Sequence, residues 1–205
     1  RDRLLGTPLR VGTREAWLPS SSIGGGEDTV LVTADLMGRR PPELRSAELD
    51  AVYHIARDPH SGRTLVSGAR RVGRDVEVGL FEVSCEGGRA RLVDARGWAP
   101  AWSSHGEFLA TVRGERDATA TDLRFGPRDD CAIRVESASG EVQDIPVDGV
   151  VLALCFDPSD ETLLFAVVCD EADARAGGPE AVRVLRLRIG RDGAQSTEIA
   201  EIART

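Results

Sequence analysis

The residues of this chain best suited to binding chemistry are arginines in long polar stretches, together with one tryptophan. They are Arg39, Arg40, Arg70, Arg71, Trp98, Arg113 and Arg116. A guanidinium group can donate two parallel hydrogen bonds to a carboxylate, and a tryptophan offers a large contact area. We therefore expect these residues to bind an acidic peptide or protein. The alternative is a solvated surface on which the arginines pair with nearby acidic residues. Those acidic residues are Glu115, Asp117, Asp129 and Asp130.

The other reactive side chains form no catalytic or metal-binding pattern. His54, His60 and His105 are scattered, whereas a metal site needs three or four converging ligands. No G-x-S-x-G motif accompanies the serines. The acidic pairs at 129–130 and 170–171 lack the ligand spacing of a calcium loop. We predict no catalytic residue, no metal site and no cofactor.

Four cysteines leave two interpretations open. They are Cys85, Cys131, Cys155 and Cys169, and none belongs to a CxxC motif. An even number permits zero, one or two disulfides, and buried thiols are the alternative to a bridge. The pair favoured for a disulfide is Cys131 with Cys169, because the strand order given below puts both at the same end of neighbouring repeats.

Charge and hydropathy exclude two classes of partner. The 205 residues carry a net charge of -8, and the 26 basic residues, all arginine, are interspersed among 34 acidic ones. No basic stripe for nucleic acid is present. The longest apolar run, residues 150–156, is strand-sized, so we expect no membrane insertion in this segment. Because the chain starts with Arg1 rather than Met, we expect an upstream segment, such as a signal peptide or anchor, to have been removed.

Three stretches of the chain repeat one pattern, an apolar strand, a polar turn and a returning strand. They are residues 54–66 (HIARDPHSGRTLV), 98–112 (WAPAWSSHGEFLATV) and 153–167 (ALCFDPSDETLLFAV). Asp58, Ser103 and Asp157 align at the turn. These turn residues are 45 and 54 positions apart. Repeats of about this length, with four short strands each, are typical of propeller blades. No segment shows helical spacing of apolar residues, so we predict an all-β fold.

The predicted fold is a β-propeller of four-stranded antiparallel blades, with about four blades present in a partial or incomplete ring. We expect one domain over residues 1–205, with a lead-in at 1–13. The blades are predicted at about 14–50, which is degenerate, 51–95, 97–147 and 149–202. Residues 43–49 are a weak strand or a short helix. The long connections, which we expect to share one face of the domain, are residues 36–42, 69–75, 113–130 and 170–180.

The repeat resembles that of TolB-like and WD-type β-propeller proteins. The usual TolB-like form is an aromatic residue, a Ser-Pro-Asp-Gly turn and an apolar strand, and PAWSSHGEFLATV at residues 100–112 is similar to it. Residues 156–160 have Asp where the family prefers Gly, and residues 57–62 lack the aromatic and have one extra residue. The resemblance covers about residues 51–202. It implies a propeller fold, which in this family serves in periplasmic scaffolds, sensor ectodomains and the gating domains of some serine peptidases.

Our leading hypothesis is a non-enzymatic protein-binding, scaffold or sensor module, the extracytoplasmic part of a bacterial protein. It would bind a protein or peptide through its long second-to-third-strand loops. The alternative is a propeller that gates substrate for a larger hydrolase or peptidase, and a third hypothesis is a propeller enzyme using central acidic residues. Open strand edges in an incomplete ring predict a homo-oligomer.

Overall fold

The chain folds entirely as β-structure in the part that the structure describes. This computed structural model describes residues 9–11, 15–20, 30–35, 43–46, 49–83, 89–114, 131–169, 181–190 and 195–203. These residues form sixteen strands and contain no helix, so none of them forms an apolar helix of membrane-spanning length. The predicted all-β fold is confirmed.

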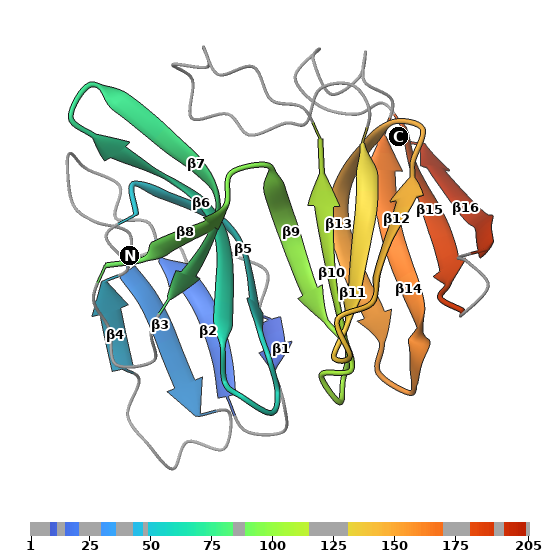
Figure 1. Ribbon diagram of the computed structural model, residues 1–205, viewed down its shortest axis with the longest axis horizontal. Helices are drawn as coiled ribbons and strands as arrows, with labels where there is room; N and C mark the ends of the chain where they lie inside the picture. Colours follow the sequence, from blue (N-terminus) through green and yellow to red (C-terminus); the bar gives the residue numbers. More distant parts are fainter. Residues whose placement is uncertain are drawn as a thin grey trace. The chain divides into compact units, whose positions relative to one another are not determined.

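The strands pair into four antiparallel sheets, each made of four consecutive strands (Figure 1). The first sheet contains β1 (Leu9–Val11), β2 (Glu15–Ser20), β3 (Val30–Asp35) and β4 (Glu43–Ser46). The second contains β5 (Ala51–Arg57), β6 (Thr64–Val72), β7 (Asp75–Val83) and β8 (Arg91–Asp94). The third contains β9 (Gly97–Trp102), β10 (Phe108–Arg113), β11 (Ala132–Ser137) and β12 (Val142–Pro146). The fourth contains β13 (Val150–Asp157), β14 (Asp160–Cys169), β15 (Ala181–Arg188) and β16 (Gln195–Ala203).

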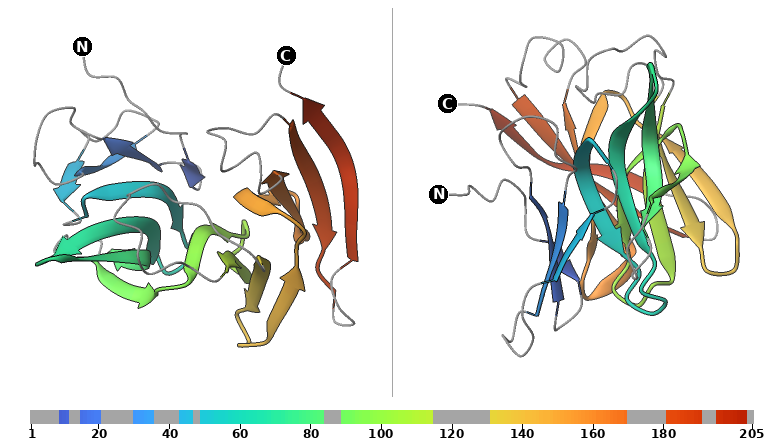
Figure 2. Two further views of the ribbon diagram at one scale, coloured as in Figure 1. Left: turned by 90° about the horizontal axis from the view of Figure 1, so that it is seen from above. Right: turned by 90° about the vertical axis from the view of Figure 1, so that its left-hand side faces the viewer.

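Each sheet follows chain order from one edge to the other, which is the meander of a propeller blade. The predicted blade architecture is therefore confirmed. The chain divides into two compact units, Arg1–Trp98 and Ala99–Thr205. In the second unit, β13 to β16 form one continuous twisted sheet that ends near the C-terminus (Figure 2).

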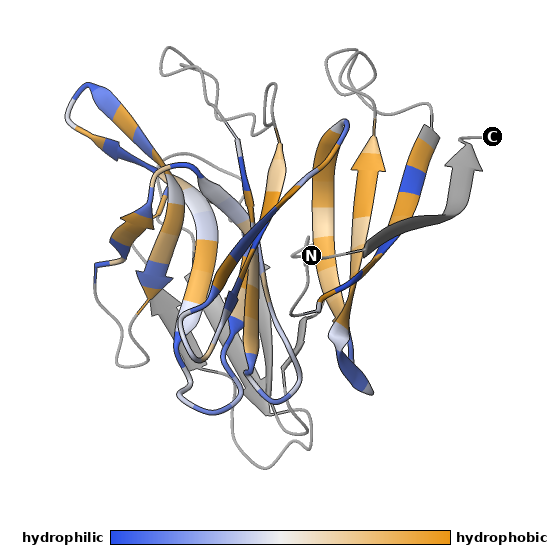
Figure 3. Ribbon diagram, turned by 45° about the vertical axis from the view of Figure 1, so that its right-hand side comes forward, coloured by the Kyte–Doolittle hydropathy of each residue, from blue (hydrophilic) through white to orange (hydrophobic). Residues whose placement is uncertain are grey.

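The second sheet is covered on both faces. Successive side chains of a strand point to opposite faces, yet all six residues from Thr64 to Ala69 in β6 are buried. Apolar side chains from neighbouring strands complete one cluster around β6. Its members are Leu49, Ile55, Val66, Phe81, Val83 and Ala90. In Figure 3 orange and blue segments alternate along several strands, while several of the turns that join strands are blue. Burial of apolar side chains on both faces thus holds the second sheet in place.

The first turn of each repeat is held by the residue that the sequence alignment places there. The Asp58 carboxylate accepts a 2.9 Å hydrogen bond from the backbone N–H of His60, and the Asp157 carboxylate accepts one of 2.7 Å from Ser159. In the third sheet the Ser103 hydroxyl accepts a 3.0 Å bond from the Phe108 N–H. Short oxygen-bearing side chains stabilise such turns because they satisfy backbone donors locally.

One predicted loop needs revision, and two open alternatives are decided. Residues 69–75 are not a long loop, because β6 continues to Val72 and β7 begins at Asp75. A two-residue turn joins them, and its first residue, Gly73, has a φ of 67°. Gly at that position favours a tight hairpin. Residues 43–46 form a strand, β4, which is one of the two alternatives for that stretch, and Leu9–Val11 within residues 1–13, interpreted as a lead-in or a stray strand, pairs with β2.

Gly79 in β7 should be the glycine least tolerant of substitution. Its φ is 153°, and an added Cβ would lie 2.3 Å from the Asp94 carbonyl oxygen. Gly73 also has a positive φ, but nothing lies within 4 Å of the position its Cβ would take. We expect Gly79→Ala to lower the free energy of unfolding by about 3–5 kcal/mol, because it combines backbone strain with overpacking. Gly73→Ala should cost about 1–2 kcal/mol from strain alone. Urea-induced unfolding measures both, and equal losses would contradict this account.

Candidate functional site

The strongest candidate for an interaction surface is a two-stranded ribbon that extends from the second sheet. Pairing of β5 with β6 stops at Ala69, and β8 pairs only with residues 80–82 of β7. Residues 70–77 therefore pair only with one another, and we call them the β6–β7 ribbon. In Figure 1 it projects at the upper left.

The tip of the ribbon carries two arginines that are available to a partner. Arg71, Arg74 and Asp75 are exposed, and 37% of the Val72 surface is exposed. Neither the Arg71 nor the Arg74 guanidinium contacts a partner among the described residues. The backbone N–H of Arg71 donates to the Asp50 carboxylate, which ties the ribbon to the start of the sheet. The tip thus presents two cations, one anion and an apolar side chain on a fixed hairpin.

Arg70 does not belong to this exposed set, contrary to the sequence prediction. Its side chain is only 12% exposed, and its Nε lies 2.7 Å from a carboxylate oxygen of Glu77. Its guanidinium lies 5.2 Å from the centre of the Phe81 ring and also donates to the Ala90 carbonyl. These contacts fix the base of the ribbon, because the charge is neutralised and its alkyl stem is covered.

Trp98 is also buried and so presents little surface to a binding partner. Only 5% of its surface is exposed, and it lies in β9, where every residue from Gly97 to Ala101 is buried. Trp98 therefore offers little surface to a partner in this structure, in contrast to the expectation from the sequence. Trp102 is half-buried, and its indole N–H has no acceptor among the described residues.

The remaining predicted arginines divide into one that is described and three that are not. Arg113 ends β10 and is half-buried. A hydrogen bond from Arg134, aided by the charge of Arg113, holds the pKa of Asp144 below its ordinary value despite partial burial. Arg39, Arg40 and Arg116 lie outside the described residues. Arg74, which sequence reasoning missed, could have been found from the Gly-Arg pair that follows Val72, a hairpin-turn signal.

The disulfide favoured between Cys131 and Cys169 is absent. Both residues carry thiols, and both are buried. Cys169 lies opposite Val150 in the β13–β14 pair, while the carbonyl of Cys131 accepts a bond from the Val147 N–H of its own sheet. Each is part of the packing of a separate sheet, where cysteine serves as a small apolar residue. Cys155 is an exposed residue whose thiol is partly desolvated, and this desolvation, together with the negative charge of Asp157, raises the pKa of the thiol.

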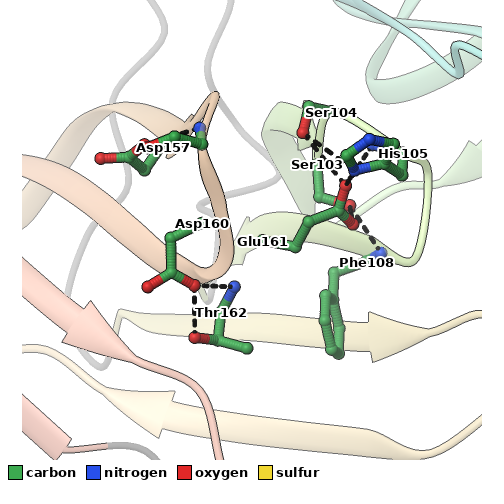
Figure 4. Close-up of polar contacts among 9 residues, drawn as sticks. Ser103, Ser104, His105, Phe108, Asp157, Asp160, Glu161 and Thr162 are labelled. Atoms are coloured by element: carbon green, nitrogen blue, oxygen red, sulfur yellow. Dashed lines mark hydrogen bonds and ion pairs between the residues drawn. The ribbon is translucent and has the colours of Figure 1, made fainter.

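A polar cluster in the second unit connects the first turns of the third and fourth sheets (Figure 4). The Glu161 carboxylate accepts hydrogen bonds from the hydroxyls of Ser103, at 2.7 Å, and Ser104, at 3.0 Å. It also accepts from the backbone N–H of His105 and lies against the His105 Nδ1. We call this set the Glu161 clasp. It fastens one blade to the next because a single carboxylate satisfies donors from the neighbouring turn.

The clasp contains serine, histidine and an acid but is not arranged for nucleophilic catalysis. In a catalytic triad the acid and the serine hydroxyl bind opposite nitrogens of the imidazole. Here Ser103 donates to the carboxylate itself, and Ser104 lies 3.4 Å from the same Nδ1 that faces Glu161. Within the clasp, no imidazole nitrogen therefore stands between the acid and a serine hydroxyl, as a triad requires. Within the described residues, no group of three or more His, Cys, Asp or Glu residues is placed to hold a metal ion.

Comparison with known proteins supports the fold. No known protein family and no curated protein sequence matches the chain. Its structure is similar to TolB from Acinetobacter baumannii, with a TM-score of 0.60 and 10% identity over 96% of this chain. It is also similar to a hypothetical selenium-binding protein from Sulfolobus tokodaii, with a TM-score of 0.52 and 12% identity over 97% of this chain. The chain spans 43% and 47% of the lengths of these two proteins. The TolB-like propeller resemblance is thus confirmed at the level of fold.

The Glu161 clasp should make the free energy of unfolding of the second unit depend on pH. Although burial raises the pKa of Glu161, hydrogen bonds from Ser103, Ser104 and His105 lower it below its ordinary value of 4.5. A carboxyl whose pKa is lowered by folding stabilises the fold above its unfolded pKa, and this contribution is lost as the pH falls below 4.5. Glu161→Gln should therefore cost about 1–3 kcal/mol at neutral pH.

The difference between wild type and Glu161→Gln should shrink as the pH falls below 4.5. Urea unfolding measured over a range of pH tests this. Glu136→Gln, which removes an exposed carboxylate of the same unit, is the matched control and should leave the pH dependence unchanged. A constant difference between Glu161→Gln and wild type at every pH would refute the role of the charge.

Proposed function

We propose that this chain is a non-enzymatic protein-binding module that recognises an acidic surface or peptide through the β6–β7 ribbon. The observation that carries the proposal is the exposed pair Arg71 and Arg74 on a hairpin that extends beyond its sheet. An arginine guanidinium group can donate two parallel hydrogen bonds to one carboxylate, and the exposed Val72 between the two cations adds apolar contact.

The ribbon suits recognition because its geometry is fixed before binding. Residues 70–77 are joined by backbone pairing, and the Arg70–Glu77 ion pair holds the base of the hairpin. A preorganised surface loses little conformational entropy on association. The backbone that carries the arginines therefore needs no ordering, and only their side chains lose freedom when they meet two carboxylates of a partner.

The absence of an enzymatic activity is part of the same proposal. It is supported by the Glu161 clasp, in which the serine, histidine and acid groups bind one another rather than forming a nucleophile and its base. A role outside the cytoplasm, as part of a bacterial scaffold or sensor, is supported by the TolB-like resemblance alone. The alternative, a gating domain of a larger hydrolase, has no separate support in the geometry.

Reversing the two tip charges should weaken binding to an acidic probe. We expect Arg71→Glu/Arg74→Glu to reduce affinity for a fluorescent polyglutamate peptide about tenfold at low salt, because two exposed charge contacts are lost and replaced by repulsion. Fluorescence anisotropy measures the change. Arg186→Glu is the control, since Arg186 is an exposed strand arginine in the other unit.

Affinity purification with the same three proteins then extends the test to native partners. Proteins retained by wild type and by Arg186→Glu but lost with the ribbon variant would be candidates for direct binding assays. Equal polyglutamate affinity and equal recovery with all three proteins would remove the ribbon from consideration.

A further inference from the structure

A groove of about 880 Å³ opens between the third and fourth sheets, within the second unit. One wall comes from β10, β11 and β12, and the other from the start of β14 and the residues that follow β15. Phe108 and Phe156 stack with ring centres 6.4 Å apart and join β10 to β13. The groove begins beside this aromatic contact, on the Phe108 side.

The groove has an apolar floor and an acidic rim. Val135 and Ile189 line it and are 2% and 8% exposed, and Phe108 is half-buried. Glu107 and Glu141 line it with exposed side chains. Neither carboxylate contacts a partner among the described residues, and no arginine or histidine lines the groove in that part of the chain. An uncompensated negative charge beside apolar surface favours a cationic, partly apolar ligand.

The groove also includes the open edge of a sheet. β12 is the last strand of its sheet, and Val142 and Gln143, which point to opposite faces, both line the groove. The Glu141 carbonyl accepts from the Ser137 N–H, and the Val147 N–H donates to the Cys131 carbonyl. Because hydrogen-bonding direction alternates along an antiparallel strand, the backbone groups of Val142 and Asp144 point away from β11.

We propose that this groove binds an extended basic peptide segment that adds to the β12 edge. The peptide backbone would pair with the outward N–H and C=O groups of Val142 and Asp144, which is the mode of β-strand addition. Residues on one face of the peptide would bring arginine or lysine to Glu141 and Glu107. Residues on the other face would cover Val142, which is 52% exposed.

A basic peptide fits this groove better than a second copy of the chain does. The chain carries a net charge of -8, so association of two copies through an acidic groove is opposed by repulsion. Pro146 at the end of β12 also limits the length of strand that can pair, since proline has no N–H and is confined to such edges. A short peptide segment meets both conditions.

The test uses a fluorescent synthetic peptide in which arginine and valine alternate, with the full chain as receptor and anisotropy as readout. We expect Glu107→Gln/Glu141→Gln to weaken binding about five- to tenfold at low salt, as expected for two surface charge contacts. Glu136→Gln/Asp148→Asn removes the same charge from exposed positions outside the groove and should change affinity less than about twofold.

A second probe tests the strand pairing without altering the protein. The same peptide methylated on alternate backbone nitrogens should lose binding in one methylation register and retain it in the other, because only one set of N–H groups faces β12. The ribbon variant Arg71→Glu/Arg74→Glu should bind the basic peptide as wild type does, so failure of this proposal is distinct from failure of the ribbon proposal.

Three results would overturn the proposal. They are no measurable binding of the alternating peptide, equal weakening by the groove and control variants, and equal binding of both methylated peptides. Self-association measured by sedimentation that the groove variant abolishes, without peptide binding, would assign the groove to a second copy instead.

Discussion

The constraint on which the rest of this structure depends is that a sheet with apolar residues on both faces must be covered on both faces. In β6 every side chain from Thr64 to Ala69 is buried, although neighbouring side chains point in opposite directions. A single sheet cannot satisfy this condition, because it would leave one apolar face in water. In the second unit the Phe108–Phe156 stack shows how one sheet covers the next. Repetition of the four-stranded unit follows from this requirement.

What could be predicted from the sequence is what neighbouring residues determine. The alternation of apolar and polar residues and the chemistry of the first turns are local features. They allowed the sequence to predict the strands of the second, third and fourth sheets and the turns at Asp58, Ser103 and Asp157. Residues 70–75 were not, because two arginines, a glycine and an aspartate have the composition of a loop. The hairpin continues there since Arg70 packs on Phe81 and pairs with Glu77 across the ribbon.

The candidate site was harder to predict from the sequence, because its contacts join residues that are far apart in the chain. Glu161 binds Ser103, Ser104 and His105, which lie 56 to 58 positions earlier. The sequence shows only that Glu161 follows a turn. Burial of Trp98 is likewise set by the neighbours of β9 rather than by its own flanking residues. Side-chain identity therefore indicated which chemistry was available, but tertiary packing decided which groups remain exposed.

The two proposed surfaces share a physical origin, because each lies where backbone pairing ends. The β6–β7 ribbon continues past the strands that flank it, and β12 is the open edge of its sheet. Inside a blade, both faces of a strand are committed to packing and both edges to hydrogen bonds, so substitution there disturbs the core. Where a strand lacks a flanking neighbour on one side, these demands are relaxed. Charge can then be placed freely, positive at Arg71 and Arg74 and negative at Glu107 and Glu141. A repeated core of this kind therefore leaves recognition to the ends and edges of its strands, and the opposite charges there fit two partners of opposite charge.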